Sequence, residues 1–308
     1  MTDDLRTSGH LAADRRYLWG EGLREEGEHA AAADLFRQAV DIAPGWATGW
    51  FAYGRAAMEA GQTDVAREAL RRCLELEPAD VLGASLLLAR LDGMQDGFAL
   101  PEAYVAGLFD AYAHRFDKHL TGTLAYRGPS VLCTALDKAC FRLGRQDRFG
   151  MTLDLGCGTG LMAAALQDRA GPIDGVDLSS RMLAKAGDTG LYRSLRNSDA
   201  VAALGSSHET YDLIIAADVV VYIGDLAPLL ETARPRLGHH GLLALTAQRQ
   251  DGKGYSLGAD LRFSHSEAYL RQATQAAGYH LAVLDITSTR RDAGVDVPGL
   301  VAVLTPVR

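Results

Sequence analysis

The chain has few cysteines, no long apolar run and no excess of positive charge. Its four cysteines form no C-x-x-C pair, and no histidine cluster completes a zinc-binding spacing. We therefore expect free thiols in a reducing compartment and no metal site. No apolar run approaches the roughly 20 residues of a membrane span, and the polar start MTDDLRTSGH lacks the apolar core of a signal peptide. These absences predict a cytoplasmic protein that does not engage a membrane.

Positive charge is outnumbered by negative charge. The 31 Lys and Arg residues face 39 Asp and Glu residues, so the net charge is −8 and the sequence pI is near 5.6. Non-specific nucleic-acid binding depends on neutralising phosphates with Lys and Arg, so we expect no nucleic-acid partner. With 308 residues, 48% of them apolar, the chain has the composition of a globular protein with one large or two medium domains.

The first third of the chain contains an internal repeat. Residues 13–46 align with residues 47–80 at a spacing of 34. Each copy divides into two helices, because a glycine is placed to end the first helix and a proline to end the second. These residues are Gly27 and Gly61, and Pro44 and Pro78. Two such copies predict an all-helical stack.

Small residues at matching positions leave room for the two helices of each copy to approach closely. They are Gly20 and Gly54, and Ala32 and Ala66. The period and the small/large pattern resemble the tetratricopeptide repeat, and DVLGASLLLARL at residues 80–91 looks like a helical cap on the stack. The resemblance implies a concave surface for a peptide or protein partner. A packing or dimerisation domain is the alternative reading.

The chain is expected to divide at a linker. Residues 1–92 form the predicted repeat domain, residues 93–103 the Gly/Pro-containing linker, and residues 104–308 a second domain that begins with helical segments. From residue 150 onward, apolar runs alternate with helical patterns, and no helical pattern separates the last two runs. This predicts a seven-stranded, Rossmann-like α/β sheet with an antiparallel hairpin at its end. The expected strands are 151–155, 172–178, 191–197, 211–219, 241–247, 280–288 and 299–306.

A glycine-rich stretch, LDLGCGTG at 153–160, follows the first of these strands and precedes a helical pattern. Glycine adopts positive φ and lets the backbone approach a ligand closely. A dinucleotide fingerprint would need a small residue at position 161, which is Leu161. The observed G-x-G-x-G, with Asp154 ahead of it, instead resembles motif I of the class I S-adenosylmethionine-dependent methyltransferases. The resemblance assigns this motif to the cofactor, with Asp154, Gly156, Cys157, Gly158 and Gly160 as binding residues.

Acidic residues follow the next strands in the order that this family shows. Asp177 ends the second strand, where a carboxylate can accept hydrogen bonds from both ribose hydroxyls. Leu178, the next residue, is also assigned to the cofactor site. The resemblance implies that Asp199 holds the adenine amino group with Ala200 beside the ring. Taken singly, each acidic residue could be a helix cap or a solvated charge.

Three further residues are assigned to the cofactor side of the domain. Met182 is placed to pack on the adenine face, although ordinary core packing explains it equally well. The resemblance implies that Asp218 and Tyr222, which follow the fourth strand, border the transferable methyl group.

The segment FDAYAHRFD at 109–117 resembles the stretch that folds over the cofactor in many small-molecule methyltransferases. This resemblance adds Tyr112 and Phe116 to the cofactor site; the alternative is an amphipathic helix with core aromatics. The combination of two repeats with this domain looks like a family of predicted bacterial tetratricopeptide-containing methyltransferases.

His265 is the candidate general base, because histidine transfers protons near neutral pH and precedes a helix in the loop after the fifth strand. Ser264 or Ser266 could cap that helix, which would leave His265 without a task. Arg262 could pair with an acidic acceptor or be solvated. The fourth strand exits as DVVVY and lacks the [DN]-P-P-[YF] of enzymes that methylate base amines, which again disfavours nucleic acid.

These features predict an S-adenosylmethionine-dependent methyltransferase that acts on an O or N nucleophile of a small molecule or peptide. The repeats would help to bind the substrate or a partner. The alternative is a catalytically inactive repeat adaptor with a vestigial methyltransferase domain.

Overall fold

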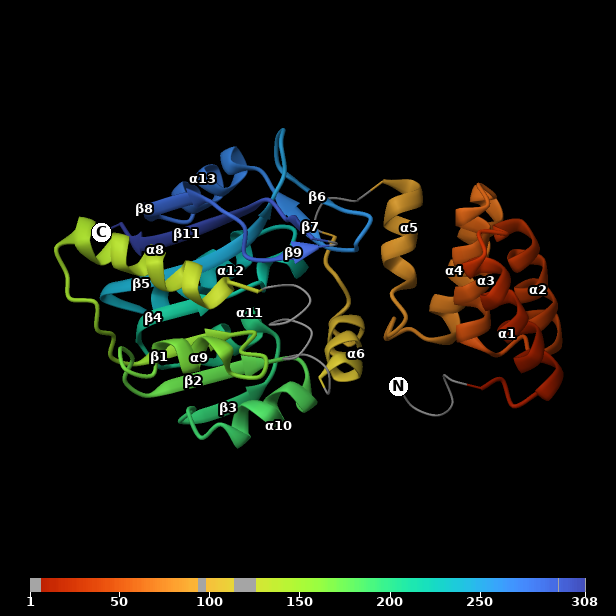
Figure 1. The fold of residues 1–308 in the computed structure, drawn as a ribbon, viewed down its shortest axis with the longest axis horizontal. Helices are drawn as coiled ribbons and strands as arrows, with labels where there is room; N and C mark the ends of the chain where they lie inside the picture. Colours follow the sequence, from red (N-terminus) through yellow and green to blue (C-terminus); the bar gives the residue numbers. More distant parts are fainter. Residues whose placement is uncertain (1–6, 94–97, 114–125, 293, 308) are drawn as a thin grey trace. The chain divides into compact units, whose positions relative to one another are not determined.

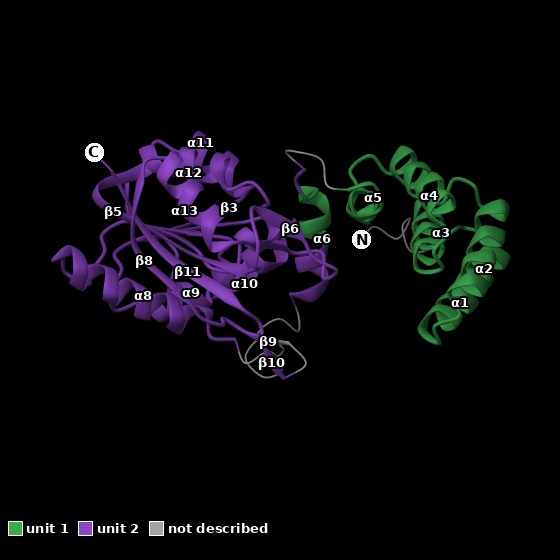
Figure 2. Cartoon of the chain, turned by 90° about the horizontal axis from the view of Figure 1, so that it is seen from above, with its two compact units in different colours: residues 1–96, 100–107 green, residues 97–99, 108–308 purple. Residues whose placement is uncertain are grey.

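A computed structural model gives the structure of the chain. It describes residues 7–93, 98–113, 126–292 and 294–307. The contacts divide the chain into two compact units, residues 1–96 with 100–107 and residues 97–99 with 108–308 (Figure 2). The division falls inside helix α6 (Glu102–Tyr112).

The N-terminal unit is built from antiparallel helix pairs (Figure 1). Helix α1 packs on α2, α2 on α3, α3 on α4 and α4 on α5. The predicted helix ends are confirmed, because Gly27 and Gly61 follow the first helix of each copy with φ of +84° and +74°. The helices are α1 (Leu11–Glu25), α2 (His29–Ile42), α3 (Ala47–Glu59), α4 (Thr63–Leu76) and α5 (Ala84–Asp92).

In each repeat, a glycine in the first helix leaves room for a large side chain of the second helix to pack against it. A Cβ atom added to Gly20 would lie 2.8 Å from Cε1 of Phe36, and one added to Gly54 would lie 2.7 Å from Cγ of Leu70. Phe36 and Leu70 are fully buried. Since they stand 34 residues apart, as the two glycines do, both copies use the same small-against-large contact.

We expect Gly20→Ala to destabilise the repeat unit by about 1–3 kcal/mol, because the added methyl group overpacks the contact with Phe36. Gly22→Ala in the same helix is the matched control: nothing lies within 4 Å of its added Cβ, and helix propensity favours alanine by about 0.5–1 kcal/mol. All three tryptophans, Trp19, Trp46 and Trp50, lie in this unit, so urea unfolding followed by tryptophan fluorescence reports on it alone. Equal stability of the two variants would contradict the packing argument.

A mixed sheet forms the centre of the C-terminal unit (Figure 1). Its strand order is β3-β2-β1-β4-β5-β11-β8, with parallel pairing from β3 to β5 and antiparallel pairing of β11 with both β5 and β8. This confirms the predicted α/β sheet with an antiparallel end. The strands on this path are β1 (Thr152–Leu155), β2 (Ile173–Asp177), β3 (Ser194–Asn197), β4 (Tyr211–Ala216), β5 (Leu237–Arg249), β8 (Tyr279–Ile286) and β11 (Gly299–Pro306).

Four short strands extend this arrangement. Strand β7 pairs with the end of β5 and with β6, and β9 and β10 form a separate two-stranded ladder. Their bounds are β6 (Tyr255–Leu257), β7 (Phe263–His265), β9 (Arg291–Asp292) and β10 (Val295–Asp296).

Helices cover both faces of the sheet. Buried side chains of α8 and α9 pack on one face, and buried side chains of α11, α12 and α13 pack on the other. The predicted helix from Pro129 is confirmed as α8, which stops at Gly144 in the left-handed conformation. The helices of this unit are α8 (Gly128–Leu143), α9 (Leu161–Leu166), α10 (Ser180–Asp188), α11 (Ala200–Ser206), α12 (Ala227–Ala233) and α13 (Glu267–Ala276), with the 3₁₀ turns η3 (Val220–Tyr222) and η4 (Arg234–Arg236).

The strand order places a switch point beside β1. The chain runs from β1 outward through β2 to β3, and then returns to β4 on the other side of β1. In open α/β sheets, ligands bind outside the carboxyl ends of the strands at such a point. The exits of β1, β2 and β4 therefore locate the candidate site. No helix of the described residues is long and apolar enough to cross a membrane.

Candidate functional site

The turn after β1 is built from glycines in the left-handed region. Gly156, Gly158 and Gly160 have φ of +63°, +55° and +97°. A Cβ atom on Gly156 would lie 2.4 Å from Cγ2 of Val219, and one on Gly160 would lie 3.3 Å from Cε2 of Tyr192. Both the backbone conformation and the space around it therefore require glycine here, and the turn presents bare backbone at the edge of the sheet.

Asp177 connects this turn to the end of β2. Its Oδ2 accepts a hydrogen bond of 2.8 Å from the N–H of Gly158, and its Oδ1 accepts one of 2.8 Å from the N–H of Ser179. The side chain is 9% exposed. Burial raises the pKa of Asp177, while the two N–H donors oppose this shift. The side chain of Asp177, which is predicted to bind the ribose, is thus held in a fixed orientation beside the glycine turn.

Asp154, which precedes the glycines, is paired with a tyrosine that the sequence did not identify. The hydroxyl of Tyr192 donates a 2.8 Å hydrogen bond to Oδ2 of Asp154, whose side chain is only 2% exposed. Burial raises the pKa of Asp154 to about 7. Burial, followed by the nearby Asp154, also raises the pKa of Tyr192. Nothing in a single sequence marks Tyr192, because its partner lies 38 positions away.

A second unpredicted residue, Asp110, holds the end of α6 near the exit of β2. Its Oδ1 accepts a 2.5 Å hydrogen bond from the hydroxyl of Ser179 and one of 3.2 Å from the N–H of Arg181. Asp110 belongs to the FDAYAHRFD stretch, and the half-buried Tyr112 follows it in α6. Phe116, the other residue predicted from that stretch, lies outside the described residues.

Asp199 caps α11 with one carboxylate oxygen. Its Oδ1 accepts hydrogen bonds of 2.8 Å and 3.0 Å from the N–H groups of Val201 and Ala202. Ala200, predicted to lie beside the adenine ring, is 8% exposed. Capping fixes the position of Asp199 at the exit of β3, and its contact with adenine stays a prediction.

Leu178 and Met182 follow β2 in different surroundings. Leu178 is half-buried, and its carbonyl accepts a 2.8 Å hydrogen bond from Nδ2 of Asn197, which also reaches the carbonyl of Asp177 at 3.0 Å. Met182 has no exposed surface. Its contact with the adenine face stays a prediction. Cys157 is 5% exposed, and burial raises the pKa of its thiol.

Asp218, which lies two residues after the end of β4, has an unusual backbone conformation, with a φ of +56° in a residue other than glycine. Its N–H donates to Oγ1 of Thr246 at 2.8 Å, and that hydroxyl donates to Oδ1 of Asp218 at 2.8 Å. Thr289 donates to the same Oδ1 at 3.3 Å. Such conformations persist only where the surroundings enforce them, and they cluster at functional sites.

His265 does not lie in a loop as the sequence suggested; it ends strand β7 and has no exposed surface. Its Nε2 lies 3.0 Å from the carbonyl oxygen of Gly224, and Nδ1 is also buried. Burial lowers the pKa of His265 and thus favours the neutral ring. Ser266 caps α13 by accepting a 3.1 Å hydrogen bond from the N–H of Tyr269. A role for His265 as base stays a prediction, and it requires the ring to leave this position.

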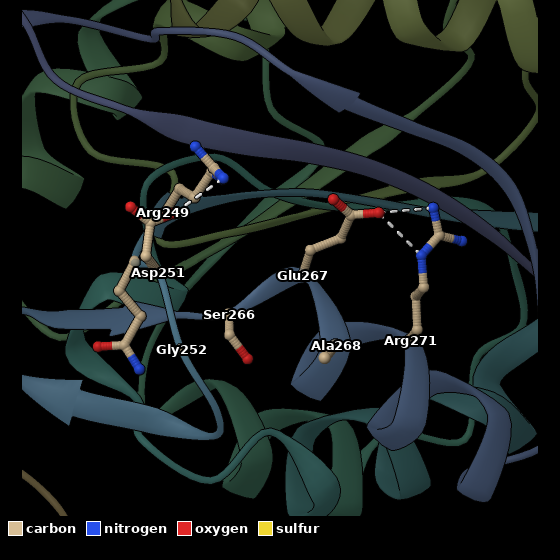
Figure 3. A pocket seen from close by; sticks show the side chains of 8 residues that line it. Arg249, Asp251, Gly252, Ser266, Glu267, Ala268 and Arg271 are labelled. Atoms are coloured by element: carbon tan, nitrogen blue, oxygen red, sulfur yellow. Dashed lines mark hydrogen bonds and ion pairs between the residues drawn. The ribbon is translucent and has the colours of Figure 1, made fainter.

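A shallow pocket of about 360 Å³ lies beside the ends of β5 and β7 (Figure 3). Two ion pairs line it, Arg249 with Asp251 at 2.9 Å and Arg271 with Glu267 at 2.8 Å. None of the predicted cofactor residues borders this pocket. No cluster of His, Cys, Asp or Glu suited to a metal ion occurs in the described part of the chain.

Comparison with known proteins identifies both parts of the chain. A family model described as a methyltransferase domain matches residues 153–243, and one described as a tetratricopeptide repeat matches residues 23–91. A search of curated protein sequences found no match.

A solved methyltransferase structure shares the fold. The 1,6-didemethyltoxoflavin-N1-methyltransferase of Burkholderia thailandensis, solved with 1,6-didemethyltoxoflavin and S-adenosylhomocysteine, is 16% identical; the match covers 70% of this chain and 93% of that chain with a TM-score of 0.51. A structure of DhpI with S-adenosylhomocysteine is 20% identical, with coverages of 67% and 97% and a TM-score of 0.48. The chain therefore combines tetratricopeptide repeats with a methyltransferase domain.

Proposed function

We propose that the C-terminal unit binds S-adenosylmethionine at the glycine turn and transfers its methyl group to an O or N nucleophile of a small molecule or peptide. The observation that carries this proposal is the position of Asp177, which is bound by the N–H groups of Gly158 and Ser179 at the exit of β2. The Asp177 carboxylate is thereby held next to the glycine turn. A ligand with a sugar at one end and an amino acid at the other could contact both, the sugar at Asp177 and the amino acid at the turn.

The residues present fit this cofactor. The three left-handed glycines form a turn of bare backbone, and side chains at Gly156 and Gly160 would crowd Val219 and Tyr192. Asp177 would accept hydrogen bonds from the ribose hydroxyls, and Asp199 with Ala200 would hold the adenine. The relative from Burkholderia thailandensis was solved with S-adenosylhomocysteine, which supports this choice of ligand.

When bound, S-adenosylmethionine supplies an electrophilic methyl group on a sulfonium. The task of the protein is then to hold the acceptor in line with that methyl group and to exclude water. Orientation of this kind can supply on the order of 7–11 kcal/mol. Asp218, held by Thr246 and Thr289 in its strained conformation, and Tyr222 in η3 are the residues proposed to border the reacting groups.

The need for a general base depends on the acceptor. A carboxylate needs none, whereas a hydroxyl or an ammonium must lose a proton. His265 is the proposed base in the second case, and its ring would have to give up its contact with the carbonyl of Gly224.

The repeat unit is proposed to bind the substrate or a protein partner. We place the repeats in residues 1–92, the linker in residues 93–103 and the transferase with its N-terminal helical segments in residues 104–308.

Calorimetric titration with S-adenosylhomocysteine tests the proposal. We expect micromolar binding by the wild-type protein, of the order of −8 kcal/mol. We expect none by Gly158→Leu, because a bulky side chain would strain a φ of +55° in the turn that is proposed to contact the cofactor. Gly205→Leu is the matched control, since this glycine is exposed on α11 and only Thr232 approaches its added Cβ, at 3.9 Å. Absence of binding by the wild-type protein would overturn the proposal.

A further inference from the structure

The most buried arginine at the carboxyl edge of the sheet forms no ion pair with any described side chain. Arg290, in the segment after β8, is 6% exposed, and its Nη2 donates a 2.8 Å hydrogen bond to the neutral amide oxygen of Gln248. Among the side chains that the structure describes, no carboxylate oxygen lies within 4.0 Å of its guanidinium. A buried charge is costly unless it is paired.

Its neighbours differ in this respect. Arg291, the next residue, is half-exposed and pairs with Asp296 at 2.9 Å. Arg249, at the end of β5, pairs with Asp251 at 2.9 Å. These two more exposed arginines thus form ion pairs within the chain, whereas Arg290 forms none with the side chains that the structure describes. This is the reverse of what stability alone would favour.

A second arginine faces the same point. Arg262, just before β7, is half-buried, and its Cζ lies 5.9 Å from the ring centre of Tyr222. Arg262 is close enough to Arg290 to lower the pKa of that guanidinium further, after burial as the main cause. Asp218 and Asp260 act on Arg290 as opposing charges, but neither forms an ion pair with it, and Oδ1 of Asp218 accepts hydrogen bonds from Thr246 and Thr289. Two like charges are therefore brought together from separate loops.

The ring of Tyr222, which interacts with both arginines, belongs to the proposed reaction centre. Tyr222 follows Asp218 at the exit of β4, and its hydroxyl interacts with Arg262 and lies in the field of Arg290. The ring also meets Phe109 edge-on, with 5.4 Å between ring centres. An acceptor that enters beside Tyr222 would thus meet an apolar wall and two guanidinium groups.

Building on the proposed function, we propose that Arg290 and Arg262 bind an oxyanionic group, a carboxylate or a phosphate ester, of the methyl acceptor. The guanidinium groups present forked donors that match two oxygens of such a group. The anion would neutralise the pair, so the acceptor would be selected by its charge. The enzyme would therefore act on acidic small molecules or on acidic ends of larger ones.

The test is calorimetry on the full chain saturated with S-adenosylhomocysteine, using benzoate, phenyl phosphate and the neutral benzamide as probes. We expect one of the two anions to bind about tenfold or more tightly than benzamide, and the preferred anion identifies the oxyanion as a carboxylate or a phosphate ester. Arg262→Gln and Arg290→Lys should each weaken that binding by about tenfold while they still bind S-adenosylhomocysteine. Arg291→Lys is the matched control and should bind the anion as the wild type does.

Equal binding of benzamide and the anions, no saturable binding of either anion, or unchanged binding by Arg262→Gln would overturn the inference. Arg262→Gln carries this test if Arg290→Lys fails to fold, because Arg262 is only half-buried. Failure of the wild-type protein to bind S-adenosylhomocysteine would instead remove the proposed function and this inference with it. Intact binding of S-adenosylhomocysteine without selection for anions overturns this inference alone.

Discussion

Asp177→Asn is expected to weaken S-adenosylhomocysteine binding by about a hundredfold or more. A hydrogen bond to a charged acceptor contributes about 1.5–3 kcal/mol, and the proposed ribose contact contains two of them. The amide would also turn an NH₂ group toward one of two N–H donors, those of Gly158 and Ser179, which now lie 2.8 Å from the carboxylate. The measurement is a calorimetric Kd at pH 7.5.

Asp174→Asn is the matched control, because Asp174 lies near the opposite end of β2. Burial alone would raise the pKa of Asp174, but hydrogen bonds from Arg193 and Ser194 hold it below its usual range. Arg193 binds both carboxylate oxygens, at 2.9 Å and 2.6 Å. This variant should lose stability and keep its affinity for S-adenosylhomocysteine. A Kd for Asp177→Asn close to that of the wild type would refute the ribose assignment.

Asp154→Asn is expected to remove a large part of the pH dependence of stability of the C-terminal unit. Burial raises the pKa of Asp154 to about 7, against about 3.9 for an unfolded chain, and this difference corresponds to about 4 kcal/mol. Between these two values the folded state binds a proton that the unfolded state lacks. The contribution of Asp154 is therefore fully present below pH 4, falls as the pH rises and is lost above pH 7.

The asparagine variant retains an oxygen that can accept from Tyr192 and carries no charge. We expect it to be more stable than the wild type at pH 8, by up to about 4 kcal/mol, with the difference shrinking toward pH 4. Hydrogen exchange of peptides from β1 and β2, measured by mass spectrometry at several pH values, reports on this unit. The urea midpoint of tryptophan fluorescence is an internal control that should not differ between variant and wild type, because all three tryptophans lie in the other unit. Parallel pH profiles for the two proteins would contradict the assignment.

Both predictions concern the same small region for a physical reason. A Gly-rich turn has no side chains of its own to hold its shape, so its neighbours must supply the order. Asp177 binds the backbone of Gly158 from β2, and Val219 fills the space beside Gly156. The turn is thereby preorganised, which reduces the entropy lost when a ligand binds.

The local features were predictable from the sequence because local rules govern them. The ends of the repeat helices depend on a glycine or proline at a given position, and Gly27 and Gly61 adopt the left-handed conformation as expected. The alternation of apolar runs with helical patterns predicted the α/β sheet and its antiparallel end, and the structure contains both. The spacing of motif I and Asp177 placed the glycine turn beside the carboxylate because both follow adjacent parallel strands.

The tertiary structure alone decided which distant residues complete the site. Tyr192 reaches Asp154 from 38 positions away, and Asp110 reaches Ser179 from 69 positions away, so no local pattern could reveal either contact. It also placed His265 in a buried strand, since pairing of β7 with β5 outweighed the loop-like composition around it. The burial of Arg290 and its closeness to Arg262 result from the way separate loops pack together in the fold. A sequence shows the charge of an arginine, but only the fold shows whether that charge is left without a partner.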